Sequence, residues 1–213
     1  AVRRGAQHAQ SLESYFTHVP GLKVICPSTA YDAKGMMIQA IRDNNPVLVF
    51  EHKLLYGDKR EAGNVSAEGE VPEESYTIPF GKAAVRREGR DITIVANLLM
   101  WYKAMEAAEV LEKEGISCEI IDPRSLYPFD YDTVVASIKK TGKLMIVHED
   151  TYTNGWGAQL AAYIAENAIM HLDASVVRVA TPDCPIPFAP VLEEYLIPSA
   201  ERIAEEARKL ARL

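Results

Sequence analysis

Short runs of apolar residues alternate along the chain with segments in which apolar residues recur three or four positions apart. The first pattern predicts buried strands, and the second predicts amphipathic helices. We expect strands at residues 22–26, 47–50, 92–96, 118–121, 144–147 and 176–179. We expect helices at about 33–41, 102–114, 131–140, 158–169 and 200–210. Because near-continuous apolar strands that alternate with helices are typical of parallel sheets covered by helices on both faces, the pattern predicts an α/β fold.

The segment 61–75 interrupts this alternation. It has no helical or strand period, and it holds five glutamates and no basic residue, which is typical of an acidic surface linker. Residues 1–60 supply only two strands and one good helix, which is too little to cover a parallel sheet on both faces. We therefore expect the chain to begin inside a domain, and we expect residues 76–213 to form a complete one.

The composition and charge exclude several classes of protein. The 213 residues carry 23 Lys and Arg against 30 Asp and Glu, a net charge of −7, and this acidic balance argues against a nucleic-acid-binding protein. No run of about 18 apolar residues is present, which argues against a membrane partner or span. The three cysteines, at positions 26, 118 and 184, are far apart and odd in number, which favours a reducing compartment over a disulfide framework.

Local motifs name no reaction. The chain has no GxGxxG, no P-loop and no GxSxG motif, and the Gly155-Trp156-Gly157 triplet is too short to count as a dinucleotide fingerprint. The five histidines include no HxxxH pair, so a zinc site built from a local motif is not expected. Residue types alone therefore predict a parallel α/β protein of unnamed function.

Longer blocks of sequence carry a resemblance to a known family. They are residues 5–13 (GAQHAQSLE), 18–24 (HVPGLKV), 41–47 (IRDNNPV), 121–128 (IDPRSLYP), 148–149 (HE), 155–158 (GWGA) and 185–189 (PIPFA). In this order, and over essentially the whole chain, they resemble the β subunit of the E1 component of thiamine-diphosphate-dependent 2-oxo acid dehydrogenases. Compared with that family, the chain lacks the first part of the pyrimidine-binding domain.

The resemblance implies a domain plan, a reaction and a set of partners. Residues 1–60 would be the second part of a pyrimidine-binding domain, 61–75 the linker, and 76–213 a transketolase C-terminal-type domain. The implied reaction is oxidative decarboxylation of a 2-oxo acid, with transfer of the acyl group to a lipoyl arm. Thiamine diphosphate and Mg²⁺ would be held mainly by the α subunit and the missing portion, so we expect this chain alone to be inactive. The implied partners are the E1 α subunit, a second β subunit in an α2β2 heterotetramer, and the dihydrolipoyl acyltransferase (E2), in the cytoplasm or, in a eukaryote, the mitochondrial matrix.

The resemblance also implies that His8 is a catalytic residue close to the reactive end of the cofactor. An imidazole can donate a proton or a hydrogen bond near neutral pH. The alternative is a loop histidine without a role, which is the usual interpretation of a lone histidine. The flanking residues favour the catalytic role here, although Ala9 stands where the family usually has serine.

Two further sites are implied in the same way. Ala40, Ile41, Asp43 and Asn45 would hold a structural K⁺, because a helix C-terminus leaves carbonyl groups without partners and a hard cation accepts such oxygens. The alternative is an ordinary helix end. Asp183 would contact a basic domain of the acyltransferase, and the alternative is a solvated loop carboxylate.

Two other functions stay open at this point. The chain could act only as an assembly and docking module, or it could belong to another thiamine enzyme such as transketolase or deoxyxylulose phosphate synthase. The blocks Asp-Asn-Asn-Pro and Pro-Ile-Pro-Phe argue against the second alternative. The sequence does not distinguish pyruvate, branched-chain 2-oxo acids and acetoin as substrates.

Overall fold

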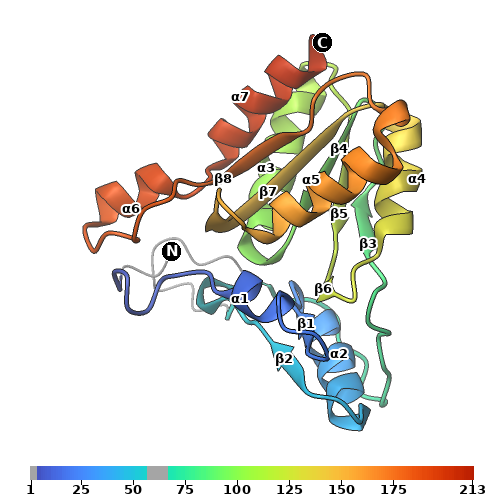
Figure 1. Ribbon diagram of the computed structural model, residues 1–213, viewed down its shortest axis with the longest axis vertical. Helices are drawn as coiled ribbons and strands as arrows, with labels where there is room; N and C mark the ends of the chain where they lie inside the picture. The colour runs from blue at the N-terminus through green and yellow to red at the C-terminus, as the bar shows by residue number, and fades with distance from the viewer. Residues whose placement is uncertain (1–3, 57–66) are drawn as a thin grey trace.

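Two β-sheets form the frame of the molecule in a computed structural model that describes residues 4–56 and 67–213 (Figure 1). Among these residues, the smaller sheet has the strand order β2 (Val47–Val49), β1 (Lys23–Ile25), β6 (Ser125–Tyr127). The larger sheet has the order β3 (Ala84–Arg87), β5 (Cys118–Asp122), β4 (Ile92–Ala96), β7 (Leu144–Thr151), β8 (Val177–Thr181). With the helices described below, the predicted α/β class is confirmed.

Each sheet carries one antiparallel edge strand, so neither is wholly parallel as the apolar pattern predicts. β3 pairs antiparallel with β5, and β6 pairs antiparallel with β1, whereas the other pairs are parallel. Strand β6 lies within the predicted second domain but belongs to the sheet of the first. The two predicted domains therefore share one sheet.

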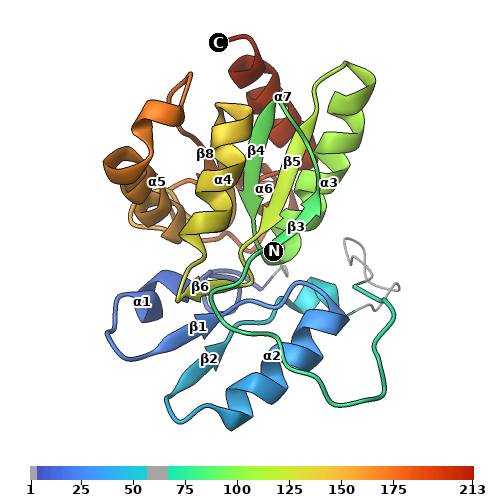
Figure 2. The same ribbon diagram turned by 90° about the vertical axis from the view of Figure 1, so that its right-hand side faces the viewer.

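Helices cover both faces of the larger sheet. Helices α3 (Leu98–Lys113) and α7 (Ala200–Ala211) pack together on one face, and α4 (Tyr131–Thr141) and α5 (Trp156–Asn167) lie on the other (Figures 1 and 2). Strands β4 and β5 are buried along their whole length. Continuous apolar runs fit this position because both faces of such a strand are covered.

Different elements cover the two faces of the smaller sheet. Helix α2 (Ala30–Arg42) covers one face and forms a small core with the sheet, made of Ile25, Met36 and Ile78. Val24 and Cys26, whose side chains alternate with that of Ile25 and so point to the other face, belong to the main core. Helix α1 (Glu13–Thr17) also packs against β1.

The helix ends follow the local sequence. Thr29 accepts a hydrogen bond from the Asp32 N–H at 3.1 Å and caps α2. Gly115, just beyond α3, has a φ of +83°, and Gly142 has a φ of +68° and ends α4. Both glycines adopt the left-handed conformation that commonly terminates helices.

The apolar pattern does not predict four short elements, namely α1, β3, β6 and α6 (Pro190–Leu196), or the 3₁₀ turns η1 (Lys53–Leu55) and η2 (Ile169–His171). Residues 67–75 of the predicted linker contain no helix or strand, and residues 61–66 lie outside the described part of the chain. Among the described helices, none is long and apolar enough to cross a membrane.

Candidate functional site

The carboxyl ends of both sheets meet inside the molecule. The Ser28 side chain, which follows β1, accepts a hydrogen bond from the backbone N–H of Leu98, which follows β4, at 2.9 Å. The Tyr102 hydroxyl donates to the Ser28 carbonyl at 2.9 Å. Open α/β sheets usually bind ligands at this edge. Here the first part of the chain covers that edge of the larger sheet (Figure 2).

A cluster of buried charges joins the two parts at this junction. Asp32 of α2 and Asp122 at the end of β5 are fully buried. The Arg86 guanidinium of β3 lies 2.8 Å from Asp122 Oδ2 and also pairs with Asp32, and Arg124 Nη1 lies 3.2 Å from Asp32 Oδ1. Burial, with a smaller contribution from Asp32, raises the pKa of Asp122 although the Arg86 guanidinium acts to lower it. The cluster therefore links α2 to the second part through buried ion pairs.

His8 lies on an exposed turn that precedes helix α1. The backbone N–H groups of His8 and Ala9 donate to the Gly5 carbonyl at 3.3 and 3.1 Å. Gly5 is buried with a φ of +65°, and a Cβ there would lie 3.5 Å from the Phe188 ring. The His8 ring makes no hydrogen bond or ion pair with the described residues. The turn that presents His8 is thus held at one end by the Pro-Ile-Pro-Phe segment of the second part.

Helix α1 holds the other end of this turn. Ser14 donates a hydrogen bond to Asp150 at the end of β7, and the Phe16 ring packs 5.6 Å from Phe50. Glu13, the first residue of α1, is only 7% exposed, and its Oε2 has no hydrogen-bond partner among the described residues. Burial, with Asp150 and Glu149 close by, raises the pKa of Glu13 to about 7.

The two glycines of the Gly155-Trp156-Gly157 triplet lie against the buried ring of His148. The His148 ring is fully buried 5.2 Å from the Trp156 ring, and burial lowers the pKa of His148 to about 4, so the imidazole is neutral at pH 7. A Cβ on Gly155 or Gly157 would lie 2.7 or 2.5 Å from this ring. The triplet therefore lets α5 begin directly against an imidazole, which is a packing role.

A cavity of about 960 Å³ opens between α1 and the start of α5. Aromatic side chains form much of its wall, and its lining residues in the described part of the chain include no lysine or arginine. The aromatic residues are Tyr15, Tyr127, Phe129, Tyr131 and Trp156. His8 does not line the cavity, so the residue predicted to be catalytic stands outside this hollow.

The segment predicted to hold K⁺ ends helix α2. Asp43 is bound by the Lys23 ammonium group and accepts a hydrogen bond from the Asn45 N–H at 2.9 Å. These contacts, with that to Lys23 the largest, lower the pKa of Asp43 to about 2. The Ala40 carbonyl accepts the Asp43 N–H at 3.2 Å, and Ile41 is 77% exposed. An ammonium group thus already neutralises the one carboxylate of this segment, which disfavours a second cation there.

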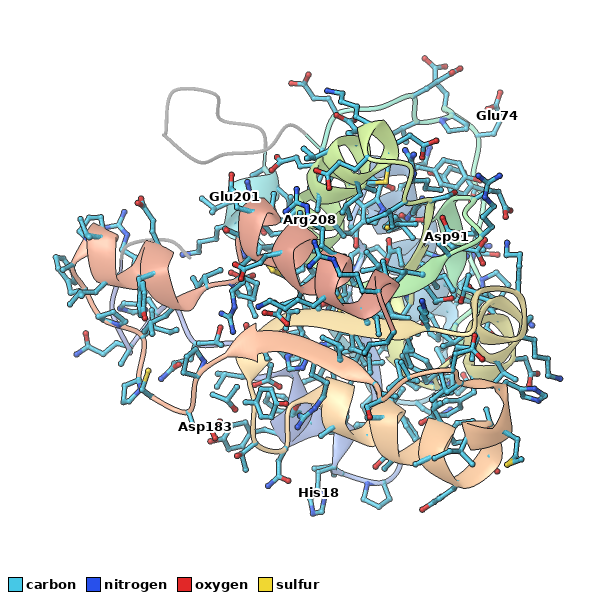
Figure 3. The ribbon with its side chains drawn as sticks, turned by 90° about the horizontal axis from the view of Figure 1, so that it is seen from above. His18, Glu74, Asp91, Asp183, Glu201 and Arg208 are labelled. Carbon is cyan, nitrogen blue, oxygen red and sulfur yellow. The ribbon has the colours of Figure 1, made fainter. Side chains whose placement is uncertain are left out.

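Asp183 lies at the surface between β8 and α6 (Figure 3). It accepts hydrogen bonds from the Thr153 hydroxyl at 2.6 Å and the Thr153 N–H at 2.8 Å, and these bonds lower its pKa. The nearby Arg178 guanidinium lies 3.8 Å over the Tyr152 ring. Asp183 is therefore an ionised, exposed carboxylate with a defined orientation.

The structure does not gather the predicted site residues into one site. His8, the segment 40–45 and Asp183 belong to different elements, and no hydrogen bond or ion pair joins them in the described part of the chain. Nor do the described residues contain a group of three or more His, Cys, Asp or Glu side chains placed to hold a metal ion. Glu13, Asp32 and Asp122 are buried acidic residues that were not among the predicted site residues. Asp122 could have been predicted as a candidate, because it directly follows the predicted apolar strand 118–121.

Comparisons with family models define the class of protein. Residues 81–203 match the model "Transketolase, C-terminal domain", and residues 3–59 match "Transketolase, pyrimidine binding domain". The chain therefore belongs to the transketolase family.

Curated relatives narrow the class to β subunits. The chain is 50% identical to the β subunit of acetoin:2,6-dichlorophenolindophenol oxidoreductase of Cupriavidus necator, over 97% of this chain and 59% of the relative. It is 43% identical to the β subunit of 2-oxoisovalerate dehydrogenase of Bacillus subtilis, over 96% and 60%. It is 45% identical to the pyruvate dehydrogenase E1 β subunit of the same organism, over 95% and 60%. The chain spans about three fifths of these relatives, and the resemblance to E1 β subunits is confirmed.

Solved structures agree with the fold. A structure described as a split gene transketolase, inactive beta4 tetramer, superposes with a TM-score of 0.76 at 25% identity, over 98% of this chain and 63% of that one. A transketolase variant from Pichia stipitis superposes with a TM-score of 0.62 at 15% identity, over 98% and 28%. The second likeness supports the transketolase fold alone.

Proposed function

We propose that this chain is the β-subunit portion of a 2-oxo acid dehydrogenase E1 enzyme, which decarboxylates a 2-oxo acid oxidatively and transfers the acyl group to lipoyl groups of the acyltransferase. The observation that carries the proposal is the identity of 43 to 50% with the β subunits of an acetoin oxidoreductase, a 2-oxoisovalerate dehydrogenase and a pyruvate dehydrogenase over at least 95% of this chain. The transketolase structures, at 15 to 25% identity, favour the shared fold and not the transketolase reaction. Thiamine diphosphate, when bound in the complete enzyme, supplies the carbanion chemistry.

The part of this chain in the reaction is to present His8. An exposed imidazole on a turn fixed at both ends can reach a substrate group or a lipoyl thiol without leaving a hydrogen bond unmade. The described residues offer no cluster of ligands for Mg²⁺, and the proposal assigns that ion, with the diphosphate, to the α subunit. K⁺ at Ala40 to Asn45 stays a prediction. Because Lys23 already pairs with Asp43, we derive no step from that ion.

The proposed assembly is an α2β2 heterotetramer bound to the acyltransferase, in the cytoplasm or the mitochondrial matrix. The domain plan stays as proposed, with units 1–60 and 76–213 joined by the linker 61–75. The matches to two separate family models support it. Exposed and ionised, Asp183 is suited to meet a basic surface of the acyltransferase. A reversal of charge, Asp183→Lys, is expected to weaken binding of the acyltransferase while leaving decarboxylation measured with an artificial oxidant unchanged.

The test of the proposal uses the full-length β subunit with its α subunit. Rates of lipoyl acylation are measured with pyruvate, 2-oxoisovalerate and acetoin, which identifies the substrate. For the best substrate, His8→Ala is expected to lower the acylation rate by about 10²–10⁴-fold. His171→Ala, which removes an exposed imidazole from η2, serves as the matched control and is expected to behave as wild type.

A second function, an assembly and docking module without catalytic residues, is favoured by one observation. Large apolar side chains are exposed on helix α6 and just before it, and Phe188, Val191 and Tyr195 are each more than 70% exposed. Exposed apolar patches of this kind mark protein interfaces. If His8→Ala acylates lipoyl groups as fast as wild type at equal assembly, the docking function replaces the catalytic one.

A further inference from the structure

Three carboxyl groups meet where α1 packs against the end of β7. Glu13 comes from α1, and Glu149 and Asp150 come from β7. Glu13 is 7% exposed, and no lysine or arginine among the described residues forms an ion pair with it. Its Oε2 accepts no hydrogen bond from those residues. A buried carboxylate in such a place is costly, whereas a neutral carboxylic acid is tolerated.

The positive and donor groups nearby already serve the other two carboxyls. Asp150 accepts the Ser14 hydroxyl and the Thr151 N–H, the latter at 2.8 Å. His52 Nε2 lies 2.7 Å from Glu149. Among the described residues, Lys23 of β1 is the one fixed positive charge on the elements packed against α1, and it pairs with Asp43. The other titratable groups there are the hydroxyl of Tyr127 on β6, neutral His148 on β7, and Tyr163 and Glu166 in the second half of α5, while the buried thiol of Cys26 directly follows β1.

Helix α1 is the element best able to move if Glu13 becomes charged. It has five residues, and no side chain caps its N-terminus at Leu12. Strand β7 is hydrogen-bonded to β4 on one side and to β8 on the other. Repulsion between the three carboxyls therefore acts on α1 and, through it, on the turn between Gly5 and Glu13 that carries His8.

We propose that Glu13 is a positioning residue whose protonated side chain holds α1 against β7 and so fixes the turn that presents His8, and that loss of this proton releases both. The significance for His8 rests on the proposed function, whereas the coupling of Glu13 to α1 does not. Burial and the two neighbouring carboxyls raise the pKa of Glu13 from 4.5 to about 7, so the packed form of α1 loses stability as pH rises through this range and is weakest above pH 7.

Hydrogen exchange of the chain without cofactor tests the coupling. Backbone exchange of peptides covering residues 4–17 is measured at pH 6 and 8 and corrected for the intrinsic rate at each pH. Wild type is expected to lose protection by roughly tenfold between the two values, because the equilibrium shifts about tenfold per pH unit up to the pKa of Glu13 near 7 and levels off above it. Glu13→Gln, which mimics the protonated acid, is expected to keep the wild-type protection of pH 6 at both values.

A matched variant excludes a general effect of charge. Glu109→Gln makes the same chemical change at an exposed position of α3, and it is expected to keep the wild-type dependence on pH. The inference is overturned if Glu13→Gln loses protection with pH as wild type does, or if wild-type protection does not change. Glu13→Ala also removes the carboxyl group that becomes charged, so its protection is expected not to change between pH 6 and 8, and a wild-type loss of protection there would also refute the inference.

The assembled enzyme then tests the consequence for His8. Glu13→Gln is expected to extend the alkaline limb of the lipoyl acylation profile by about one pH unit, which a purely structural role would not do. Identical profiles for wild type and Glu13→Gln would refute the link between α1 and His8. A wild-type acylation rate in His8→Ala would instead refute the proposed function and leave the exchange result intact.

Discussion

The substitution Asp32→Ala breaks the charged cluster that joins the two parts of the chain. Asp32 is fully buried, and it pairs with both Arg86 and Arg124. Its removal leaves Arg86 with Asp122 alone and Arg124 without its carboxylate partner, and it also removes the acceptor of the Thr29 hydroxyl at the start of α2. Loss of one partner from a buried ion pair typically costs about 3–5 kcal/mol, because the remaining charge stays buried without compensation.

A loss of this size is a large share of the total free energy of unfolding. A domain is typically stable by about 5–15 kcal/mol, so we expect Asp32→Ala to remove a third or more of the free energy of unfolding. With a urea dependence near 3 kcal/mol per molar, the midpoint of unfolding is expected to fall by about 1–2 M. Far-UV circular dichroism in urea measures the shift. Asp32→Asn retains the shape and loses the charge, and it is expected to fall between Asp32→Ala and wild type.

An exposed ion pair on α7 provides a comparison with the buried Asp32 cluster. Lys209 bridges Glu205 and Glu206 on α7, where Lys209 and Glu205 side chains are 58% and 64% exposed. Lys209→Ala is expected to cost no more than about 1 kcal/mol, because solvent screens exposed pairs. If Asp32→Ala costs as little as Lys209→Ala, the buried cluster contributes nothing to joining the two parts, and the reasoning fails.

Three further predictions concern buried groups. Because the pKa of Glu13 rises from 4.5 to about 7 on folding, wild type is expected to lose about 3 kcal/mol of stability as pH rises from 4.5 to 7. Glu13→Gln is expected to remove this loss, which urea titrations at pH 5 and 8 measure. Because the pKa of His148 falls from 6.5 to about 4 on folding, wild type is expected to lose about 3 kcal/mol of stability as pH falls through this range. His148→Gln is expected to abolish that loss, and a stability that still falls with pH as in wild type would contradict the prediction. A Cβ on Gly35 would lie 2.6 Å from the Tyr76 ring and 2.8 Å from Ile78, so Gly35→Ala is expected to cost about 1–3 kcal/mol, which a wild-type melting temperature would exclude.

The regular part of the fold could be predicted because its signal is local. Buried strands of the larger sheet, such as Ile92–Ala96, are continuous apolar runs. Strand β3 escaped detection because it is an edge strand that contains two arginines, and β6 because its three residues gain their order from β1, about 100 positions earlier. Met36 and Met37 could not both face the core, because adjacent residues on a helix point about 100° apart; Met36 is buried and Met37 is 38% exposed.

The candidate site could be predicted only in part. The family resemblance supplied His8 and Asp183, but no physical pattern in the sequence distinguishes them from other polar loop residues. Burial of Asp32 could not be foreseen, because aspartate is normally exposed unless paired and its partners Arg86 and Arg124 lie 54 and 92 residues away along the chain. Glu13 lies within the family block 5–13, yet the lack of a hydrogen-bond partner for its buried Oε2 depends on how α1 packs near the end of β7.

The pairing of β6 with β1 bears on how this protein can be taken apart and recombined. A chimera that exchanges residues 1–60 between two relatives would seat the new strands beside a foreign Ser125–Tyr127 edge. A chimera should therefore exchange residues 125–127, Arg86 and Arg124 together with residues 1–60. A protease cut within 67–75 would sever the backbone, but the shared sheet and the buried charges should keep the two pieces bound as a nicked complex.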